Sequence, residues 1–358
     1  MEQYQIPFEA FQLQGLVLSA TPNGNGHINR TFHVRTDSGD YLVQRINTDV
    51  FPDVDGLMNN IKLVSAHIRK RLRAEGKDVD RGCMTIIPTQ GGKLYARTES
   101  GCWRAFYFIK NCRTLEAPRS PEDFYMTARA FGHFQAQLSD FPAQELVEVI
   151  PNFHNTPKRL RDLWEAEKAD KMGRVKEVQK ELDFIREREA FGATIQSGIE
   201  KGTLPLAVTH NDTKLNNLLF DKATMEPLCV IDLDTVMPGS TLYDFGDSIR
   251  FGAATADEDE KDLSKMECSL PMFDAFVRGW MESTGDVITP AERALLPESA
   301  RILTLECGSR FLADYLNGDT YFATSRPGQN LDRCRTQLKL VADMEKKDDE
   351  MHKIVDKY

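Results

Sequence analysis

The stretch Val208-Thr-His-Asn-Asp-Thr-Lys-Leu-Asn-Asn217 contains the pattern H-x-D-x-x-x-x-N, and Val230-Ile-Asp-Leu-Asp234 follows shortly after it. An Asp, an Asn and a second Asp in this order supply what ATP-dependent phosphoryl transfer to a hydroxyl group requires. Asp212 can hold the attacking hydroxyl and accept its proton. Asn217 and Asp232 offer oxygen ligands, which suit the octahedral coordination of Mg²⁺. The two stretches therefore predict a phosphoryl transfer that uses ATP and Mg²⁺.

The D-x-D pair Asp232 and Asp234 follows the apolar run Leu228–Ile231, which predicts a buried strand. Alternation of side chains along a strand would place both carboxylates on one face at its end. Two close like charges are costly unless a cation lies between them, so Asp234 is a second candidate metal contact. Phosphatases of the haloacid-dehalogenase type and metal-dependent glycosyltransferases also use D-x-D. Neither class accounts for the H-x-D-x-x-x-x-N pattern.

The composition is that of a globular chain that acts on small molecules. Its 358 residues are enough for two lobes, each with its own core. The net charge of −10 argues against a general binder of nucleic acid or anionic membranes. We read no signal peptide at the N-terminus and find no apolar run long enough for a membrane span. The cysteines are scattered and never form C-x-x-C, so we expect them to be reduced thiols. We therefore expect a cytoplasmic protein with small-molecule partners, and infer no nucleic acid, membrane or protein partner.

The pattern of secondary structure changes along the chain. Strand signals dominate its N-terminal part, with a hairpin turn at Asp37–Asp40 and one helix at Val54–Leu72. Helical patterns dominate afterwards. We therefore expect an α+β fold of the two-lobed, protein-kinase-like type. Residues 1–108 would form a small antiparallel β-rich lobe that covers the nucleotide, residues 109–112 a hinge, and residues 113–358 a larger, mainly helical lobe.

Local signals predict where several helices begin or break. Ser120-Pro-Glu-Asp123 and Thr289-Pro-Ala-Glu292 both have the sequence of a helix N-terminus. The second of them should open a helix that runs towards Tyr315. The charged region Lys158–Glu189 is helical in pattern and should break near Gly173.

Candidate nucleotide contacts come from a glycine-containing turn, one strand residue and the hinge. Glycines let backbone N–H groups approach phosphate oxygens, although an ordinary hairpin loop also fits this turn. The chain lacks the G-x-x-x-x-G-K-[ST] sequence of P-loop enzymes. The predicted nucleotide-binding residues are Gly24, Asn25, Gly26, Gln44, Phe108, Ile109 and Lys110.

The order of these motifs resembles the aminoglycoside-phosphotransferase and choline-kinase family, a branch of the protein-kinase-like fold. The resemblance is carried by the H-x-D-x-x-x-x-N pattern, by Ile231-Asp-Leu-Asp234 and by Tyr243-Asp-Phe-Gly-Asp247, and it spans nearly the whole chain. It implies an ATP-dependent kinase of a small hydroxyl compound. The implied roles are catalytic base for Asp212, Mg²⁺ ligand for Asn217 and Asp232, and support of the catalytic loop for His210 and Asp244.

Further motifs resemble one subfamily, the N-acetylhexosamine kinases. These motifs are Gly26-His-Ile-Asn29, Met237-Pro-Gly-Ser240, Phe245–Gly252 and Arg310-Phe-Leu-Ala-Asp-Tyr-Leu316. The subfamily phosphorylates the anomeric hydroxyl of N-acetylglucosamine and N-acetylgalactosamine to the α-1-phosphate. The resemblance implies a sugar site formed by His27, Asp212, Arg310 and Tyr321. From the residues alone, Arg310 and Asp314 also fit an ordinary salt bridge along a helix.

One expected feature of the wider family is missing. The strand Tyr41–Ile46 should carry a cation that faces the nucleotide phosphates, and by alternation that position is Gln44. The helix Val54–Leu72 has only one acid, Asp55, so the usual Lys–Glu pair is absent. A nucleotide-binding pseudokinase therefore stays open as an alternative. So do kinases of hexoses, choline, homoserine or aminoglycosides, and the D-x-D phosphatases and glycosyltransferases.

Overall fold

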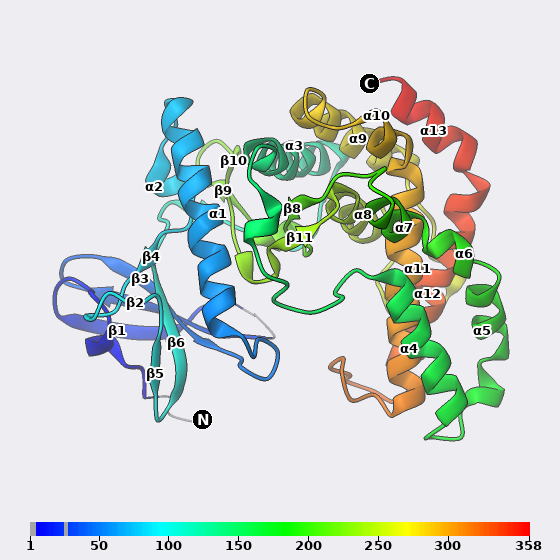
Figure 1. Ribbon diagram of the computed structural model, residues 1–358, viewed down its shortest axis with the longest axis horizontal. Coiled ribbons are helices and arrows are strands. Elements are labelled where there is room, and N and C mark those ends of the chain that lie inside the picture. Colours follow the sequence, from blue (N-terminus) through cyan, green and yellow to red (C-terminus); the bar gives the residue numbers. More distant parts are fainter. Residues whose placement is uncertain (1–4, 25–27) are drawn as a thin grey trace. The chain divides into compact units, whose positions relative to one another are not determined.

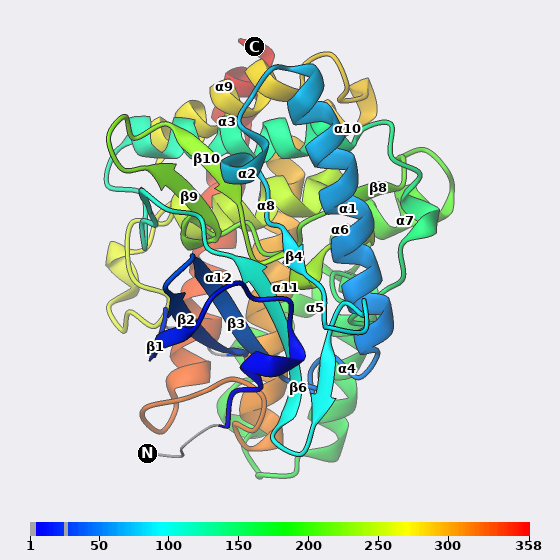
Figure 2. The same ribbon diagram turned by 90° about the vertical axis from the view of Figure 1, so that its left-hand side faces the viewer.

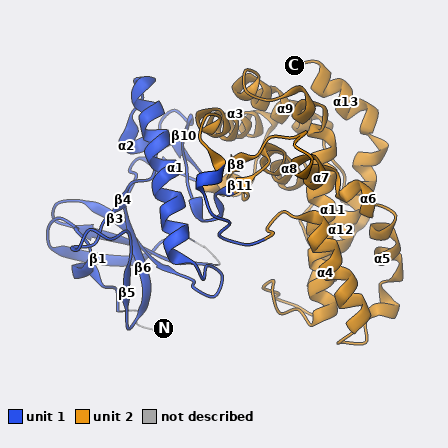
Figure 3. Ribbon diagram, viewed as in Figure 1, with its two compact units in different colours: residues 1–114, 144–151, 218–237 blue, residues 115–143, 152–217, 238–358 orange. Residues whose placement is uncertain are grey.

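The computed structural model describes residues 5–24 and 28–358, and the chain divides into two compact units (Figure 3). Unit 1 comprises residues 1–114, 144–151 and 218–237, and unit 2 comprises residues 115–143, 152–217 and 238–358. Two segments from further along the chain thus join the N-terminal unit. The functional lobes at residues 1–108 and 113–358, with a hinge at 109–112, stay a prediction.

The main sheet of unit 1 is antiparallel, with strand order β1-β2-β3-β6-β4, and β5 pairs with β6 (Figures 1 and 2). The strands are β1 (Val17–Pro22), β2 (Arg30–Thr36), β3 (Asp40–Ile46), β4 (Ile86–Ile87), β5 (Ala96–Thr98) and β6 (Gly101–Tyr107). The predicted hairpin between β2 and β3 is confirmed. Its turn is held by Thr36, whose hydroxyl accepts hydrogen bonds from the backbone N–H groups of Ser38 and Gly39.

The two faces of this sheet differ in chemistry because side chains alternate along each strand. One face packs an apolar cluster that includes Val34, Val43 and Trp103. The other face carries Gln44 and Arg104, which lie opposite each other in the register of β3 and β6. Neighbours in such a register lie within side-chain reach, so the polar face is set up for a shared network.

Unit 1 also contains helices and a second, three-stranded sheet of order β10-β9-β7. These elements are α1 (Val54–Ala74), α2 (Val79–Gly82), β7 (Cys112–Arg113), β9 (Leu218–Asp221) and β10 (Pro227–Val230). Asp53 caps α1 by accepting a hydrogen bond from the backbone N–H of Gly56. The predicted helix at Val54–Leu72 is therefore confirmed, with one further half-turn.

Unit 2 is mainly helical, as predicted. Its α-helices are α3 (Pro121–Leu138), α4 (Thr156–Ala169), α5 (Gln179–Arg186), α6 (Glu189–Gly192), α7 (Thr194–Glu200), α8 (Thr241–Gly252), α9 (Leu270–Thr284), α10 (Pro290–Ala294), α11 (Leu296–Asn317), α12 (Gln329–Lys346) and α13 (Asp348–Asp356). Strands β8 (Ala207–Thr209) and β11 (Met237–Gly239) pair with each other. A core cluster joins α4, α5, α11 and α12. Among the described residues, no helix has both the length and the apolar character needed to cross a membrane.

Short 3₁₀ turns complete the chain: η1 (Phe8–Ala10), η2 (Ala143–Glu145), η3 (Val175–Glu177), η4 (Leu215–Asn217), η5 (Leu233–Thr235) and η6 (Leu263–Lys265). The break predicted near Gly173 is confirmed, since α4 ends at Ala169 and α5 begins only at Gln179. Gly173 itself has φ +67°, a conformation that favours glycine.

The two predicted helix N-termini form as expected, but one helix is shorter than predicted. Ser120 accepts a hydrogen bond from Asp123 N, and Thr289 and Glu292 form a reciprocal capping box. The helix opened by Thr289 ends at Ala294, and α11 starts anew at Leu296. The expectation of one helix to Tyr315 is therefore wrong. Pro297 lies in the first turn of α11, and a proline lacks the N–H that would continue the preceding helix.

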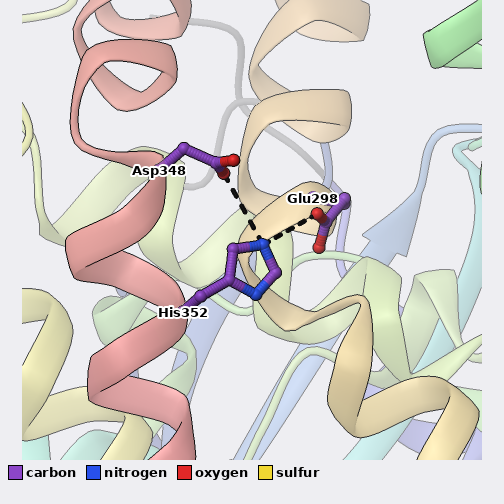
Figure 4. Close-up of side chains that lie close together, drawn as sticks. All are labelled: Glu298, Asp348 and His352. Carbon is purple, nitrogen blue, oxygen red and sulfur yellow. Dashed lines mark hydrogen bonds and ion pairs between the residues drawn. The ribbon is translucent and has the colours of Figure 1, made fainter.

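A cluster of charged side chains fastens α13 to α11 (Figure 4). His352 Nε2 lies 3.0 Å from Glu298 Oε1 and 3.6 Å from Asp348 Oδ1. Arg301 Nη2 lies 3.2 Å from Glu298 Oε1 and 3.0 Å from Asp348 Oδ1. Because the Arg301 guanidinium contacts the carboxylates of both Glu298 and Asp348, the four side chains form an ion-pair cluster.

Candidate active site

The loop after β8 brings Asp212 and Asn217 together. The side-chain N–H group of Asn217 donates to Asp212 Oδ2 at 2.9 Å and to the Asp212 carbonyl oxygen at 2.8 Å. The 3₁₀ turn η4 ends at Asn217 and so turns its amide back towards the loop. The amide oxygen of Asn217 makes no hydrogen bond to any described residue. It is therefore available to a ligand from outside the chain.

Asp244, on α8, holds the backbone of this loop. Its carboxylate accepts hydrogen bonds from Asn211 N at 2.7 Å, His210 N at 2.9 Å and Gln135 Nε2 at 2.5 Å. Asn211 has φ +65°, which is uncommon for a residue other than glycine. The hydrogen bond from its backbone N–H to Asp244 stabilises this turn of the loop. Burial raises the pKa of Asp244, while His210 and these hydrogen bonds oppose that rise. The contacts are those of a structural support.

The His210 ring is enclosed beside the same loop. It lies edge-on to the rings of Phe131 and Phe134, at 5.7 and 5.8 Å between centroids. Its Nδ1 accepts a hydrogen bond from Asp212 N at 3.3 Å. His210 thus fixes the backbone of Asp212 and is buried away from solvent.

A second buried histidine ties the loop to α11. His154 Nε2 lies 3.2 Å from the carbonyl oxygen of Asn211, and its Nδ1 lies 2.8 Å from Glu306 Oε1. Thr156 donates to the other oxygen of Glu306 at 2.7 Å. Burial pulls the pKa of His154 down, but the Glu306 carboxylate outweighs burial and raises it. No sequence motif singled out this pair, since its members come from segments far apart in the chain.

Lys214 is a site residue that the sequence reasoning missed. Its ammonium Nζ lies 2.9 Å from Asp212 Oδ1, and its side chain is 39% exposed. The charge of Asp212 raises the pKa of Lys214 despite the opposing effect of burial, so the side chain carries its proton at neutral pH. Lys214 stands within the motif itself. The sequence did not predict its ion pair with Asp212, because spacing along a loop does not give the direction of a side chain.

Asp232 and Asp234, in unit 1, do not share a strand face, so that prediction is wrong. Strand β10 ends at Val230, Asp232 has the left-handed backbone angles φ 58° and ψ 58°, and the 3₁₀ turn η5 follows. A left-handed residue and a 3₁₀ turn both end the two-residue alternation of a strand. The alternation on which a shared face depends therefore does not extend through Asp232.

Asp234 is buried against Arg104. Its Oδ2 accepts hydrogen bonds from Arg104 Nη2 at 2.9 Å and from Asn29 Nδ2 at 2.5 Å. Its Oδ1 lies 2.5 Å from Arg104 Nη1 as an ion pair. The sequence made Asp234 a candidate metal contact. The geometry instead favours a role in holding the D-x-D turn to the sheet.

The same network explains Gln44. Its side-chain oxygen accepts a hydrogen bond from Arg104 Nε at 2.9 Å, and its amide donates to Thr31 Oγ1 at 2.9 Å. A lysine at position 44 would bring a second cation against this guanidinium. The strand β3 thus carries a neutral residue where the neighbouring strand β6 supplies the cation.

The predicted nucleotide contacts are partly described. Gly24 is exposed and has φ +77°, a conformation that favours glycine, whereas Asn25, Gly26 and His27 lie outside the described residues. Phe108 stacks on His33 with ring centroids 4.2 Å apart, and the ammonium of Lys110 pairs with Asp40. Ile109 is buried. The segment 108–110 is thus anchored within unit 1.

Arg310 and Tyr321 line a pocket of about 440 Å³ in unit 2, together with Arg159, Lys171 and Phe322 among others. The Arg310 guanidinium lies 5.4 Å from the Phe153 ring, 5.9 Å from the Tyr321 ring and 5.5 Å from the Phe322 ring. Arg310 forms no hydrogen bond or ion pair with a described residue. An arginine that lies among aromatic rings and makes no ion pair with a described residue can donate to an oxygen-rich ligand.

The salt bridge between Arg310 and Asp314 that the sequence allowed is absent from the described part of the chain. Asp314 accepts hydrogen bonds from the backbone N–H groups of Thr320, Tyr321 and Phe322, at 2.9, 2.8 and 2.9 Å. Asp314 therefore shapes the loop that carries Tyr321, whose side chain is 68% exposed.

Comparisons with known proteins find one family model and several solved structures similar to this chain. The family described as APH, Phosphotransferase enzyme family, matches residues 19–271. A microcompartment-associated aminopropanol kinase is similar over 96% of both chains, with 14% sequence identity and a TM-score of 0.60. An aminoglycoside phosphotransferase from Alicyclobacillus acidocaldarius is similar over 96% of this chain and 93% of its own, with 12% identity and a TM-score of 0.60. These likenesses confirm the predicted α+β, protein-kinase-like fold.

Proposed function

Because the chain belongs to the phosphotransferase enzyme family, we propose that it transfers the γ-phosphoryl group of ATP to the anomeric hydroxyl of an N-acetylhexosamine. The product would be the α-1-phosphate, which makes the proposed activity that of an N-acetylhexosamine 1-kinase. The observation that carries the reaction is the contact of Asp212 with Asn217 and Lys214 in one loop. A carboxylate held in place beside a cation and an amide suits a base that orients a hydroxyl group.

Asp212 would accept a hydrogen bond from the acceptor hydroxyl and align its oxygen with the γ-phosphorus. As the new O–P bond forms, the P–O bond to ADP breaks and ADP leaves with that electron pair. The hydroxyl proton passes to Asp212. Positioning and charge stabilisation account for most of the rate in such transfers.

The donor atoms proposed for Mg²⁺ fit a hard cation. Asn217 turns its N–H group to Asp212, which leaves its amide oxygen for the metal, and Asp232 offers a carboxylate. A bound Mg²⁺ would neutralise charge on the phosphate oxygens. Asp234 is left out of this ligand set because both of its oxygens face Arg104.

The acceptor is the finer part of the proposal, and two observations support it. The motifs around Ile28, Pro238 and Arg310 resemble the N-acetylhexosamine kinases. The pocket of Arg310 and Tyr321 offers a fork-shaped donor and aromatic faces, which are the groups that bind sugars. His27 is proposed as a further sugar contact from the resemblance.

An ATP-consumption assay with a panel of acceptors tests this choice. We expect turnover with N-acetylglucosamine and N-acetylgalactosamine, and far slower turnover with choline, homoserine and kanamycin. The reason is that choline would bring a second cation beside Arg310, which makes no hydrogen bond or ion pair with a described residue, whereas a sugar brings neutral oxygens. Preference for any of the last three acceptors would contradict the sugar assignment. ATP binding without turnover on any acceptor would favour the pseudokinase.

Replacing Asp232 by Ala should remove Mg²⁺-dependent nucleotide binding. The substitution takes away the carboxylate that would neutralise the metal, while the Arg104–Asp234 pair that holds the turn stays intact. Isothermal titration calorimetry with Mg·ATP and with metal-free ATP measures the difference. Asp49→Ala, at an exposed carboxylate of the same unit, is the control and should bind Mg·ATP normally. Normal Mg·ATP affinity in Asp232→Ala would exclude Asp232 as a ligand.

A further inference from the structure

We propose that His154 is a positioning residue of the phosphoryl transfer, and that it holds the loop of Asp212 only while both of its ring nitrogens carry protons. The proposal rests on the proposed function, because it assumes that Asp212 must face the acceptor hydroxyl. It goes beyond that function, because it assigns a fall of activity at alkaline pH to a buried histidine outside the proposed catalytic set.

Both ring nitrogens of His154 face oxygen atoms that can only accept hydrogen bonds. Nδ1 lies 2.8 Å from Glu306 Oε1, and Nε2 lies 3.2 Å from the carbonyl oxygen of Asn211. A neutral imidazole has one N–H group and can donate to only one of these oxygens, whereas the imidazolium donates to both. The geometry therefore requires the protonated ring as long as Glu306 is ionised.

A neutral pair with the proton on Glu306 would fill the same contacts, but the surroundings favour the ion pair. The hydroxyl of Thr156 donates to Glu306 Oε2 at 2.7 Å, and such a hydrogen bond is stronger to an ionised carboxylate. Burial would raise the pKa of Glu306, but the charge of His154 outweighs burial and lowers it. The two side chains are 6% and 1% exposed, so solvent screens their attraction little.

Other groups that act on the His154 ring come from two helices. Helix α11 contributes Glu306 and Arg310, and α8 contributes Asp247 and the ring of Tyr243, whose centroid lies 5.3 Å from that of His154. Burial lowers the pKa of His154, and Glu306 raises it by more. Asp247 adds to the rise and Arg310 opposes it, so the net direction is upward.

The carbonyl that His154 contacts belongs to the peptide bond between Asn211 and Asp212. The N–H group of the same peptide bond donates to His210 Nδ1 at 3.3 Å, so a histidine contacts each side of it. Rotation of this peptide bond would displace the carboxylate of Asp212. Because a displacement of about 1 Å can cost about 10²-fold in rate, the contact with His154 matters for the base although His154 touches no substrate.

The sign of the pH effect follows from the two contacts. Below the raised pKa of the folded state, the His154 ring donates to both oxygens. As the pH rises through that pKa, the remaining proton stays on Nδ1, because Glu306 is charged and the Asn211 carbonyl is not. Nε2 then turns a lone pair towards the carbonyl oxygen, and the contact is lost. We therefore expect kcat to fall on the alkaline side.

The decisive variant is Glu306→Gln, which keeps the shape of the side chain and removes its charge. The amide of this glutamine can donate to Nδ1 of a neutral His154 ring, whose Nε2–H group then faces the Asn211 carbonyl at any pH. We expect kcat at neutral pH close to that of the parent chain, and no alkaline fall. Glu165→Gln, at an exposed carboxylate of the same unit, is the control and should keep the parent pH profile.

The double variant His154→Phe/Glu306→Gln removes the donor without leaving a buried charge unpaired. It differs from Glu306→Gln only in the ring that contacts Asn211, and phenylalanine is close to histidine in shape. We expect kcat to be about 10²-fold lower than in Glu306→Gln at every pH. Thermal unfolding checks that both variants are folded.

Nuclear magnetic resonance gives a readout that does not depend on turnover. The chain has seven histidines, and labelling their rings with ¹⁵N reports the protonation of each nitrogen. The signals that disappear in the double variant belong to His154. At neutral pH we expect two protonated ring nitrogens in the parent chain and one in Glu306→Gln.

Three results overturn the proposal: a neutral His154 ring in the parent chain at neutral pH, a parent kcat that does not fall on the alkaline side, or an alkaline fall that persists in Glu306→Gln. If the parent chain turns over no acceptor, the proposed function fails instead, and the ¹⁵N signals still decide whether the His154 ring is doubly protonated. The two failures are thus distinguishable.

Discussion

Asp212→Asn should lower kcat by about 10²- to 10⁴-fold, the usual contribution of a general base, and leave Mg·ATP binding nearly unchanged. Asn has the same shape as Asp, and its amide oxygen can still accept the hydrogen bond from Asn217 Nδ2. The loop backbone is held by Asp244 and His210, which the change does not touch. What is lost is the carboxylate that accepts the hydroxyl proton.

Steady-state kinetics with the best acceptor and calorimetry with Mg·ATP measure the two halves of this prediction. Asp286→Asn, which neutralises an exposed carboxylate of the same unit, serves as the matched control. Near-normal turnover in Asp212→Asn would remove Asp212 from the catalytic role. Loss of both turnover and nucleotide binding would indicate a disrupted loop, which hydrogen exchange of peptides from residues 207–217 would detect.

The largest effect on stability should come from Arg104→Met. This change leaves the buried Asp234 carboxylate without its cation, and loss of one partner of a buried ion pair typically costs about 3–5 kcal/mol. Gln44 would also lose the donor to its side-chain oxygen. The double variant Arg104→Met/Asp234→Asn should recover part of the loss, because no uncompensated charge then remains buried.

Hydrogen exchange of peptides from residues 101–107 and 228–236 measures this effect within unit 1. The pair of the exposed Arg119 with the partly buried Asp123, in unit 2, offers a contrast, and Arg119→Met should leave exchange of these peptides unaltered. If Arg104→Met exchanged as slowly as the parent chain, the Arg104–Asp234 pair would not be the contact that secures the D-x-D turn.

The sequence predicted well wherever the controlling interactions are local. The Ser120 cap and the Thr289–Glu292 capping box each depend on residues within one helical turn, and both form. Asp212 and Asn217 lie in one short loop, and the 3₁₀ turn that ends at Asn217 brings them into contact, which the sequence did not predict. The alternation that placed Gln44 and Arg45 on opposite faces also held, because β3 is a regular strand.

Prediction failed where the structure depends on strand register or on an irregular backbone. The pairing of Gln44 with Arg104 requires the register of β3 with β6, which no single segment encodes. The expected common face of Asp232 and Asp234 assumed that a strand continues through the motif, whereas a left-handed residue ends it. The direction of the Lys214 side chain depends on the same kind of loop geometry, so the sequence did not predict its ion pair with Asp212.

Helix α11 carries three of the contacts described above at intervals of four residues. Glu306 reaches the catalytic loop through His154, Arg310 enters the pocket, and Asp314 holds the loop of Tyr321. Residues four apart lie on the same side of a helix, and eight residues span about 12 Å along its axis. A single helix thus fixes the spacing between the loop of Asp212 and the pocket of Arg310 and Tyr321. A shift of α11 along its axis would therefore move the loop of Asp212 and the pocket of Arg310 together.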